Sequence, residues 1–283
     1  MIIPSYDVQS NVRLKVHHLT PKASANKPVV LMCHPTGFCG LAYASVTAHL
    51  RNANVFALDA RSHGESDRGS LTSWNGFQKD LDSVFDFLKD FTKHNNFIGL
   101  GISSGASAHI LNASINKDLY SGLYLSEPIL FPPGTDLAHR ESLALSARRR
   151  RDSFGSYDEA FFKYKDKGAL SHLSKSALGL YVSNGFELLD NSITLKCNKE
   201  DEEAIYLSGT ANGVWEALSN IDVSSLIVYG EHSNTVTLAL AQKIAHQMKK
   251  AKIEMMPNVG HFTLFEQPYN AAKSITNFIN SIA

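Results

Sequence analysis

The stretch Gly101-Ile102-Ser103-Ser104-Gly105 decides how the chain folds. The mostly apolar residues 96–100 before it are typical of a buried strand, and residues 106–111 after it are typical of the start of a helix. A G-x-S-x-G pattern between a strand and a helix predicts a nucleophile elbow, in which a tight turn presents the hydroxyl of Ser103 above a parallel sheet. Glycine on both sides permits the close backbone approach of such a turn. Taken alone, the five residues also fit an ordinary strand–turn–helix junction.

Predicted strands and helices alternate on both sides of this turn. Residues 12–19 alternate apolar and polar side chains for part of their length, which is typical of an antiparallel edge strand. Strands separated by helices imply an α/β fold, in which a mostly parallel sheet lies between two layers of helices. Further strands are predicted at residues 28–33, 55–59, 122–126, 224–230 and 253–256, and helices at residues 41–50, 73–91, 237–250 and 269–282.

The alternation lapses between Pro128 and Asp222, over far more residues than usually connect a strand to its helix. We therefore predict a core domain formed by residues 1–128 and 222–283, into which residues 129–221 are inserted as a helical cap. The aromatic side chains of the cap should partly pack against one another and partly roof an apolar pocket. The helices expected in the cap span residues 137–151, 157–164, 175–184 and 201–218.

The strongest charge run in the chain is Arg148–Arg151, within the first predicted helix of the cap. A solvated helix end explains these arginines well, because cations are favourable at the C-terminus of a helix. A clamp for an anionic substrate is the alternative interpretation.

The amino-acid composition limits the kinds of molecule that this protein is expected to bind. The 283 residues suffice for one large α/β domain with an insertion, and 27 basic side chains balance 27 acidic ones, which favours neither nucleic acid nor an anionic membrane as partner. The three cysteines lack C-x-x-C spacing, which argues against a disulfide framework or a zinc site. Residues 1–7 lack the basic stretch and the apolar run typical of a signal peptide, and no apolar segment approaches the ~20 residues that span a bilayer, so we expect neither a signal peptide nor a membrane span. We expect a cytoplasmic protein that takes a small-molecule substrate and could form a homo-oligomer.

Four chemically useful side chains follow predicted strands, where ligands of parallel sheets bind: Ser103, His34, Glu127 and His261. A serine hydroxyl is a poor nucleophile near neutral pH, so acyl transfer needs an imidazole to take its proton and a carboxylate to orient that imidazole. We predict Ser103 as nucleophile and His261 as base, since His261 lies in the loop after the last strand. His63 and His109 are expected to be structural.

The residue that supplies the carboxylate is harder to assign from the sequence. The commonest arrangement places an aspartate three residues beyond the glycine that ends the penultimate strand, but Ser233 occupies that position after Gly230. A hydroxyl cannot stabilise an imidazolium as a carboxylate does. Glu127 ends the strand that follows the elbow, so we predict it as the acid, with Glu231 as the alternative.

The oxyanion of a tetrahedral intermediate needs two backbone N–H donors, one from the residue after the nucleophile and one from the loop after the first buried strand. Ser104 supplies the first donor, at the start of the elbow helix. Thr36 is predicted to supply the second, because the preceding Pro35 has no N–H.

Together these motifs resemble the α/β-hydrolase superfamily over nearly the whole chain. The resemblance rests on the His34–Gly37 loop, the Asp59–Asp67 loop that looks like the D-x-R-G-x-G-x-S-D motif, the elbow, and Gly260-His261-Phe262. It implies an eight-stranded, mostly parallel sheet with helices on both faces, a helical cap inserted after strand 6, and no cofactor or metal.

Within that superfamily, Thr36–Gly40, Glu127–Ile129 and the arginine-rich helix are similar to a subgroup of uncharacterised esterase-like or lipase-like hydrolases. The position of Glu127 also resembles that of the acid in some haloalkane dehalogenases. Those enzymes and epoxide hydrolases use an aspartate nucleophile, so Ser103 argues against both activities.

The function expected from these residues is that of a serine hydrolase that cleaves carboxylic esters through an acyl-enzyme. A thioesterase, amidase, perhydrolase or carbon–carbon bond hydrolase would use the same groups. A ligand-binding protein without activity also stays open, because Ser233 stands where an aspartate is usual and because a fold does not dictate its function.

Overall fold

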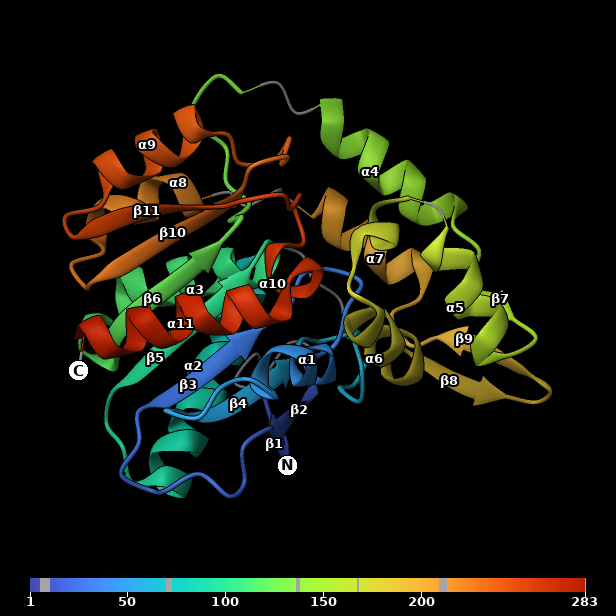
Figure 1. Cartoon of the computed structure of the whole chain (residues 1–283), viewed down its shortest axis with the longest axis horizontal. Helices are drawn as coiled ribbons and strands as arrows, with labels where there is room; N and C mark the ends of the chain where they lie inside the picture. The colour runs from blue at the N-terminus through green and yellow to red at the C-terminus, as the bar shows by residue number, and fades with distance from the viewer. Residues whose placement is uncertain (6–10, 70–72, 136–137, 167, 209–212, 283) are drawn as a thin grey trace.

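The computed structural model describes residues 1–5, 11–69, 73–135, 138–166, 168–208 and 213–282. Its centre is an eight-stranded sheet in the order β1-β2-β4-β3-β5-β6-β10-β11 (Figure 1). The first two strands pair antiparallel, as do β2 and β4, and every other neighbouring pair is parallel. The strands are β1 (Ile2–Pro4), β2 (Arg13–His18), β3 (Val29–Cys33), β4 (Asn54–Asp59), β5 (Phe97–Ile102), β6 (Tyr120–Ser126), β10 (Ser225–Gly230) and β11 (Ala251–Met256).

This architecture confirms the predicted eight-stranded α/β fold, with one difference at the edge. The predicted antiparallel strand is present as β2, but β1 covers its outer side, so β1 forms the edge. Three residues, Ile2–Pro4, are too few to show a periodic pattern, which is why the sequence did not indicate this strand.

Helices cover both faces of the sheet. The elbow helix α3 packs against α2 on one face, whereas α11 packs against α1 on the other and crosses the front of the sheet in Figure 1. The helices and 3-10 turns of the core are η1 (Gly40–Tyr43), α1 (Ala44–Thr47), α2 (Asn75–Thr92), α3 (Ser104–Ile115), η2 (Lys117–Leu119), α9 (Leu238–Gln247), α10 (Thr263–Glu266) and α11 (Pro268–Ile282).

Each face of the sheet has its own apolar core. The alternation of side chains along β3 shows why a central strand must be apolar throughout: Leu31 and Cys33 point into the core beneath α2 and α3, whereas Val30 and Met32 point into the core beneath α1 and α11. Both cores reach the C-terminal ends of the parallel strands, so the loops that leave those ends start from fixed positions.

The segment between β6 and β10 contains more than helices. Its helices are α4 (Ala138–Arg149), α5 (Tyr157–Lys165), η3 (Ala169–His172), α6 (Lys175–Gly185), α7 (Lys199–Leu207), α8 (Val214–Ala217) and η4 (Leu218–Asn220). A three-stranded sheet, β7 (Ser153–Phe154), β9 (Ser192–Leu195) and β8 (Phe186–Leu189), lies among them on the right of Figure 1. The predicted helix at residues 201–218 is divided, because α7 ends at Leu207 and α8 begins at Val214.

The small sheet was missed because its strands are short, although its turn left a signal. Leu189 pairs with Ser192, so Asp190 and Asn191 form a two-residue hairpin loop. Asp190 has a φ of 53°, a left-handed conformation that aspartate and asparagine tolerate well. Helix α6 of this segment contacts η1, α1 and α10, which fixes the segment to the core near the loop that follows β3.

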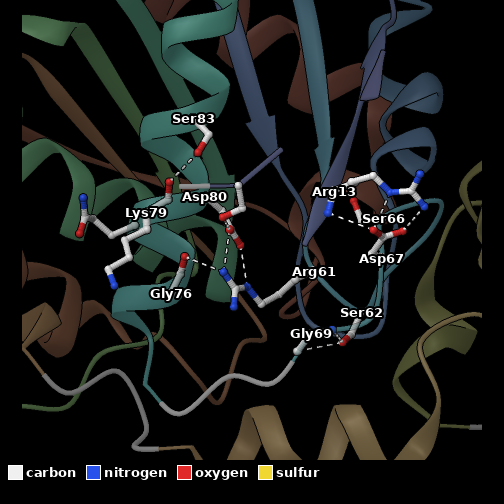
Figure 2. A network of polar contacts seen from close by, with 12 residues as sticks. Arg13, Arg61, Ser62, Ser66, Asp67, Gly69, Gly76, Lys79, Asp80 and Ser83 are labelled. Carbon is white, nitrogen blue, oxygen red and sulfur yellow. Dashed lines mark hydrogen bonds and ion pairs between the residues drawn. The ribbon is translucent and has the colours of Figure 1, made fainter. Parts of the chain in front are cut away.

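The loop after β4 is fixed to the core by a buried ion pair (Figure 2). Arg61 is 1% exposed, and its Nε and Nη2 donate to the two carboxylate oxygens of Asp80 in α2, at 2.8 and 2.7 Å. On the other side of the loop, Asp67 pairs with Arg13 of β2 at 2.8 Å. Removal of one partner from a buried pair typically costs 3–5 kcal/mol, roughly, so Arg61 holds this loop far more firmly than the exposed Arg13 does.

Among the described residues, no helix combines the length and the apolar character that a membrane-spanning helix needs.

Candidate active site

Ser103 lies at a strained turn between β5 and α3. Its backbone has φ 58° and ψ −125°, a conformation that residues other than glycine rarely adopt. A Cβ at Gly101 would lie 2.4 Å from the Ala106 nitrogen, and a Cβ at Gly105 would lie 2.1 Å from the Cys33 carbonyl oxygen. Both distances are impossible for a side chain, so the turn requires glycine at these two positions. The Ser103 side chain stands at the C-terminal end of the parallel sheet.

Glu127 and His261 meet beside this turn. Glu127 follows β6, is fully buried, and has a φ of 48°. Its Oε2 lies 3.1 Å from His261 Nδ1, and its Oε1 accepts the Gly230 N–H at 2.8 Å. A carboxylate only accepts hydrogen bonds, so the proton of a neutral His261 lies on Nδ1, and Nε2 is left as the basic nitrogen.

Glu231, the alternative acid, points elsewhere. Its side chain accepts the N–H of Asn258 at 2.8 Å in an exposed position. Of the two carboxylates left open by the sequence, the structure brings Glu127 to the imidazole.

The described residues include no hydrogen bond between Ser103 Oγ and His261 Nε2. Catalytic hydrogen bonds are often long in free enzymes and shorten when substrate binds.

Ser233 was not predicted as a site residue, because in the sequence it was noted only as occupying the position where an aspartate is usual. Its hydroxyl donates to Glu127 Oε2 at 2.6 Å, and its Oγ accepts the Thr235 and Val236 N–H groups at 3.1 and 3.3 Å. Those two donors turn the hydroxyl proton toward the glutamate. The signal that could have identified Ser233 is its position three residues after Gly230, where a polar group faces the end of β6.

Thr36 and Ser104, the predicted oxyanion donors, lie side by side. The Thr36 hydroxyl donates to Ser104 Oγ at 3.0 Å, which joins the loop after β3 to the first residue of α3. Within the described parts of the chain, neither the Thr36 N–H nor the Ser104 N–H donates a hydrogen bond. Both groups are therefore available to a ligand.

A cavity lies beside these two residues, between α2 and α3 rather than beneath the inserted segment. Thr36, Ser104, Phe77 and Leu81 contribute to its wall, and its volume is about 20 Å³. That is room for one water molecule. The cavity is too small to be a substrate pocket by itself.

Of the four arginines in the charge run, Arg150 is turned inward. Its Nη1 pairs with Glu202, and its Nη2 donates to the hydroxyls of Tyr181 and Tyr164 at 2.7 and 3.2 Å. The ion pair of Arg150 and Glu202 packs against Gly37 in the loop after β3. A Cβ at Gly37 would be 3.0 Å from Glu202 Oε1 and 3.5 Å from Arg150 Nη1. Because Glu202 balances its charge, Arg150 is a poor anion clamp in this state.

The buried aromatic residues of the inserted segment pack both within the segment and against the core. Phe154 and Phe186 are buried within the segment. Tyr181 instead contacts Phe38 of the loop after β3, with ring centroids 4.9 Å apart, and Phe38 lies at the same distance from Phe262, the neighbour of His261. One aromatic cluster thus joins the inserted segment to the loops that carry Thr36 and His261.

Three histidines of the core, His34, His63 and His109, are buried in the neutral form. Burial lowers the pKa of His34 to about 3, with a further contribution from His63, and lowers the pKa of His109 to about 4. Burial also lowers the pKa of His63. Both His63 and His109 are enclosed by protein.

Acid should therefore destabilise the fold. Below pH ~6.5 the unfolded chain binds protons that the folded histidines exclude, so the free energy of unfolding should fall as the pH is lowered. The loss at pH ~5.5 should be about 1.4 kcal/mol for each of His34 and His109, whose pKa values lie well below that pH. Urea unfolding at several pH values measures this loss. Replacing His109 by glutamine should reduce the slope, because it removes one of the histidines that titrates only in the unfolded chain. A free energy of unfolding that stays constant from pH 7 to 5.5 would contradict the expectation.

Comparison with known proteins shows which family this chain is similar to. The sequence model of the alpha/beta hydrolase family matches residues 30–272. A protein phosphatase methylesterase 1 of Debaryomyces hansenii is 22% identical over 96% of this chain and 73% of its own length.

Two solved structures show the same fold at low sequence identity. The structure of E-2-(acetamidomethylene)succinate hydrolase has a TM-score of 0.80 at 18% identity and covers 99% of both chains. The thioesterase domain from the curacin biosynthetic pathway has a TM-score of 0.75 at 20% identity, again over 99% of both chains.

Proposed function

The chain belongs to the alpha/beta hydrolase family, and within it we propose that the chain is a serine hydrolase that cleaves carboxylic esters of a small molecule through an acyl-enzyme. The observation that carries this proposal is the contact of the buried Glu127 carboxylate with His261 Nδ1 at 3.1 Å, beside a serine in an elbow conformation. The name of the curated relative, a methylesterase, supports an ester as the bond cleaved.

The proposed mechanism assigns one step to each group. Ser103 Oγ attacks the ester carbonyl while His261 Nε2 takes its proton, and Glu127 orients the ring and stabilises the imidazolium. The N–H groups of Thr36 and Ser104 stabilise the oxyanion, a contribution of about 3 kcal/mol for each donor. His261 then returns the proton to the leaving alcohol, and water hydrolyses the acyl-enzyme by the same steps.

Several finer assignments belong to this proposal. Residues 129–221 would act as the cap over the substrate, as the contacts of Tyr181 and Arg150 with the loop after β3 suggest. A reducing, cytoplasmic location is supported by three cysteines that are all free and buried. No cofactor takes part in the proposed steps.

A substrate panel tests the ester preference. The purified protein should hydrolyse p-nitrophenyl esters, and its kcat/KM for esters should exceed that for the thioester and amide with the same acyl group. The ester should be cleaved faster than the amide because p-nitrophenolate leaves as the anion, whereas an amine can leave only after His261 has protonated its nitrogen. Acyl chains of two to twelve carbons define the length accepted. A higher kcat/KM for the thioester would reassign the chain as a thioesterase.

A further inference from the structure

Two buried histidines link the loop after β3 to the loop after β4 in a reciprocal way. His34 starts the first loop, and its Nε2 accepts the N–H of Ala60 in the second loop at 3.0 Å. His63 lies in the second loop, and its Nε2 accepts the N–H of Gly37 in the first loop at 2.9 Å. The exposed fractions of the two side chains are 3% and 1%, and their ring centroids lie 4.9 Å apart.

The hydrogen bonds fix the tautomer of each ring. His34 Nδ1 lies 2.9 Å from the carbonyl oxygen of Pro35, and His63 Nδ1 lies 2.8 Å from that of Arg61. A carbonyl can only accept and a backbone N–H can only donate, so each ring must carry its single proton on Nδ1 and a lone pair on Nε2. Both rings are therefore neutral, and a proton added to either Nε2 would break a link.

The charged groups around the two rings have other partners. Asp59 accepts the Gly40 N–H at 2.6 Å and contacts His17 Nε2 at 2.8 Å. Glu202, above Gly37, is paired with Arg150. Because these carboxylates have hydrogen-bond partners of their own, the neutral rings are consistent with their surroundings.

The linked residue, Gly37, directly follows the proposed oxyanion donor Thr36. Gly37 has a φ of 83°, a conformation that favours glycine, and the Thr36 side chain is held by Ser104. The Pro35 carbonyl, which shares a peptide plane with the Thr36 N–H, is bonded to His34 Nδ1, and the Gly37 N–H is bonded to His63 Nε2, so the peptide groups on both sides of Thr36 are fixed. Its own N–H is then left to face a ligand.

We propose that His63, with His34 as its counterpart, is a positioning residue that holds the Thr36 N–H in place for the oxyanion. This role rests on the proposed function of Thr36. Arg61 supports the arrangement, because its buried pair with Asp80 fixes the loop whose carbonyl orients the His63 ring.

Two substitutions at one position test the proposal. His63→Phe keeps an aromatic ring but removes the acceptor for the Gly37 N–H, whereas His63→Gln keeps an acceptor oxygen. Loss of one oxyanion donor costs about 100- to 1,000-fold in kcat, so misplacement of one should lower kcat about 10- to 100-fold, with KM changed less than about threefold. His63→Gln should recover most of the loss. Affinity for a trifluoromethyl ketone, which forms an oxyanion adduct with a serine, should fall in parallel with kcat/KM.

Controls separate positioning from folding. His109→Phe removes a second buried histidine that does not touch these loops, so it should lower stability without lowering kcat. Urea unfolding of each variant shows whether it is folded under the assay conditions. Wild-type kcat in folded His63→Phe, or no recovery in His63→Gln, would overturn the proposal.

A measurement that needs no turnover distinguishes this proposal from the proposed function. Nitrogen-15 NMR of the imidazole rings should show His34 and His63 neutral with the proton on Nδ1 at pH 7, assigned by loss of the His63 signals in His63→Gln. Protonation on Nε2 of either ring would overturn the positioning role even if the protein is an esterase. If the predicted tautomers are found but wild-type protein cleaves no ester, the proposed function fails instead.

Discussion

Replacing Ser103 by alanine should lower kcat for ester hydrolysis by a factor on the order of 10⁴ to 10⁶. The loss should be this large because the hydroxyl forms the acyl-enzyme bond and none of the other groups assigned to the site can replace it. Initial rates with a p-nitrophenyl ester at pH 7.5 measure the effect. A fluorophosphonate probe should label the wild-type protein on the peptide that contains Ser103 and leave the variant unlabelled.

The variant should remain folded, which makes the result interpretable. Ser103 Oγ has no hydrogen-bond partner among the described residues, so its removal should change the free energy of unfolding by less than about 1 kcal/mol. Ser114→Ala is a matched control, because it makes the same change in α3, the helix that Ser103 precedes, and among the described residues its hydroxyl bonds only the Leu111 carbonyl. Turnover retained by Ser103→Ala would reject this nucleophile. Wild-type protein that neither turns over esters nor reacts with the probe would favour a ligand-binding role.

The fold followed from the sequence wherever a physical requirement acts on neighbouring residues. A strand buried on both faces must be apolar throughout, and β3 is recognisable for that reason. Helix α2 buries one side, and its residues Phe77, Leu81 and Leu88 recur at helical spacing. The edge strand β1 and the hairpin of β8 and β9 were not predicted, because these strands are only three or four residues long.

Only part of the candidate site could be predicted from the sequence. The ends of the strands are predictable, but the directions in which their side chains point are not. Ser103 could be predicted because the tight turn around it leaves no room for a Cβ on either side, so glycine is required at both positions. Whether Glu127 or Glu231 meets His261 depends on how the side chains after two different strands are oriented, and no local pattern records that. The same holds for His63, whose partner Gly37 lies 26 residues away.

Replacing Glu127 by glutamine should lower kcat about 10³- to 10⁴-fold. The carboxylate accepts three donors: the Gly230 N–H on Oε1, and the Ser233 hydroxyl and His261 Nδ1 on Oε2. A glutamine has only one acceptor oxygen, so its NH₂ group must face either the Gly230 N–H or the imidazole. In the first case a buried donor loses its partner, and in the second the His261 proton is driven to Nε2, where it cannot accept the Ser103 proton.

Glu231→Gln is the matched control, with the same chemical change on the other candidate acid. Its exposed side chain accepts only the Asn258 N–H among the described residues, and a glutamine oxygen can accept that bond as well. We expect kcat within about twofold of wild type, given the small effects of exposed substitutions. Exchange of the two results would identify Glu231 as the acid.

Ser233 allows a stricter test of where the negative charge must lie. Its Oγ is 2.6 Å from Glu127 Oε2, on the same side as His261. An aspartate there would place a carboxylate within reach of the imidazole without help from β6, so Ser233→Asp in the Glu127→Gln background should recover about 10-fold or more of the lost kcat. Ser233→Asn in that background has the same shape without the charge and should recover nothing. Recovery with aspartate alone would show that the site needs a negative charge behind His261 Nδ1, and recovery with both would show that it needs only a hydrogen-bond acceptor.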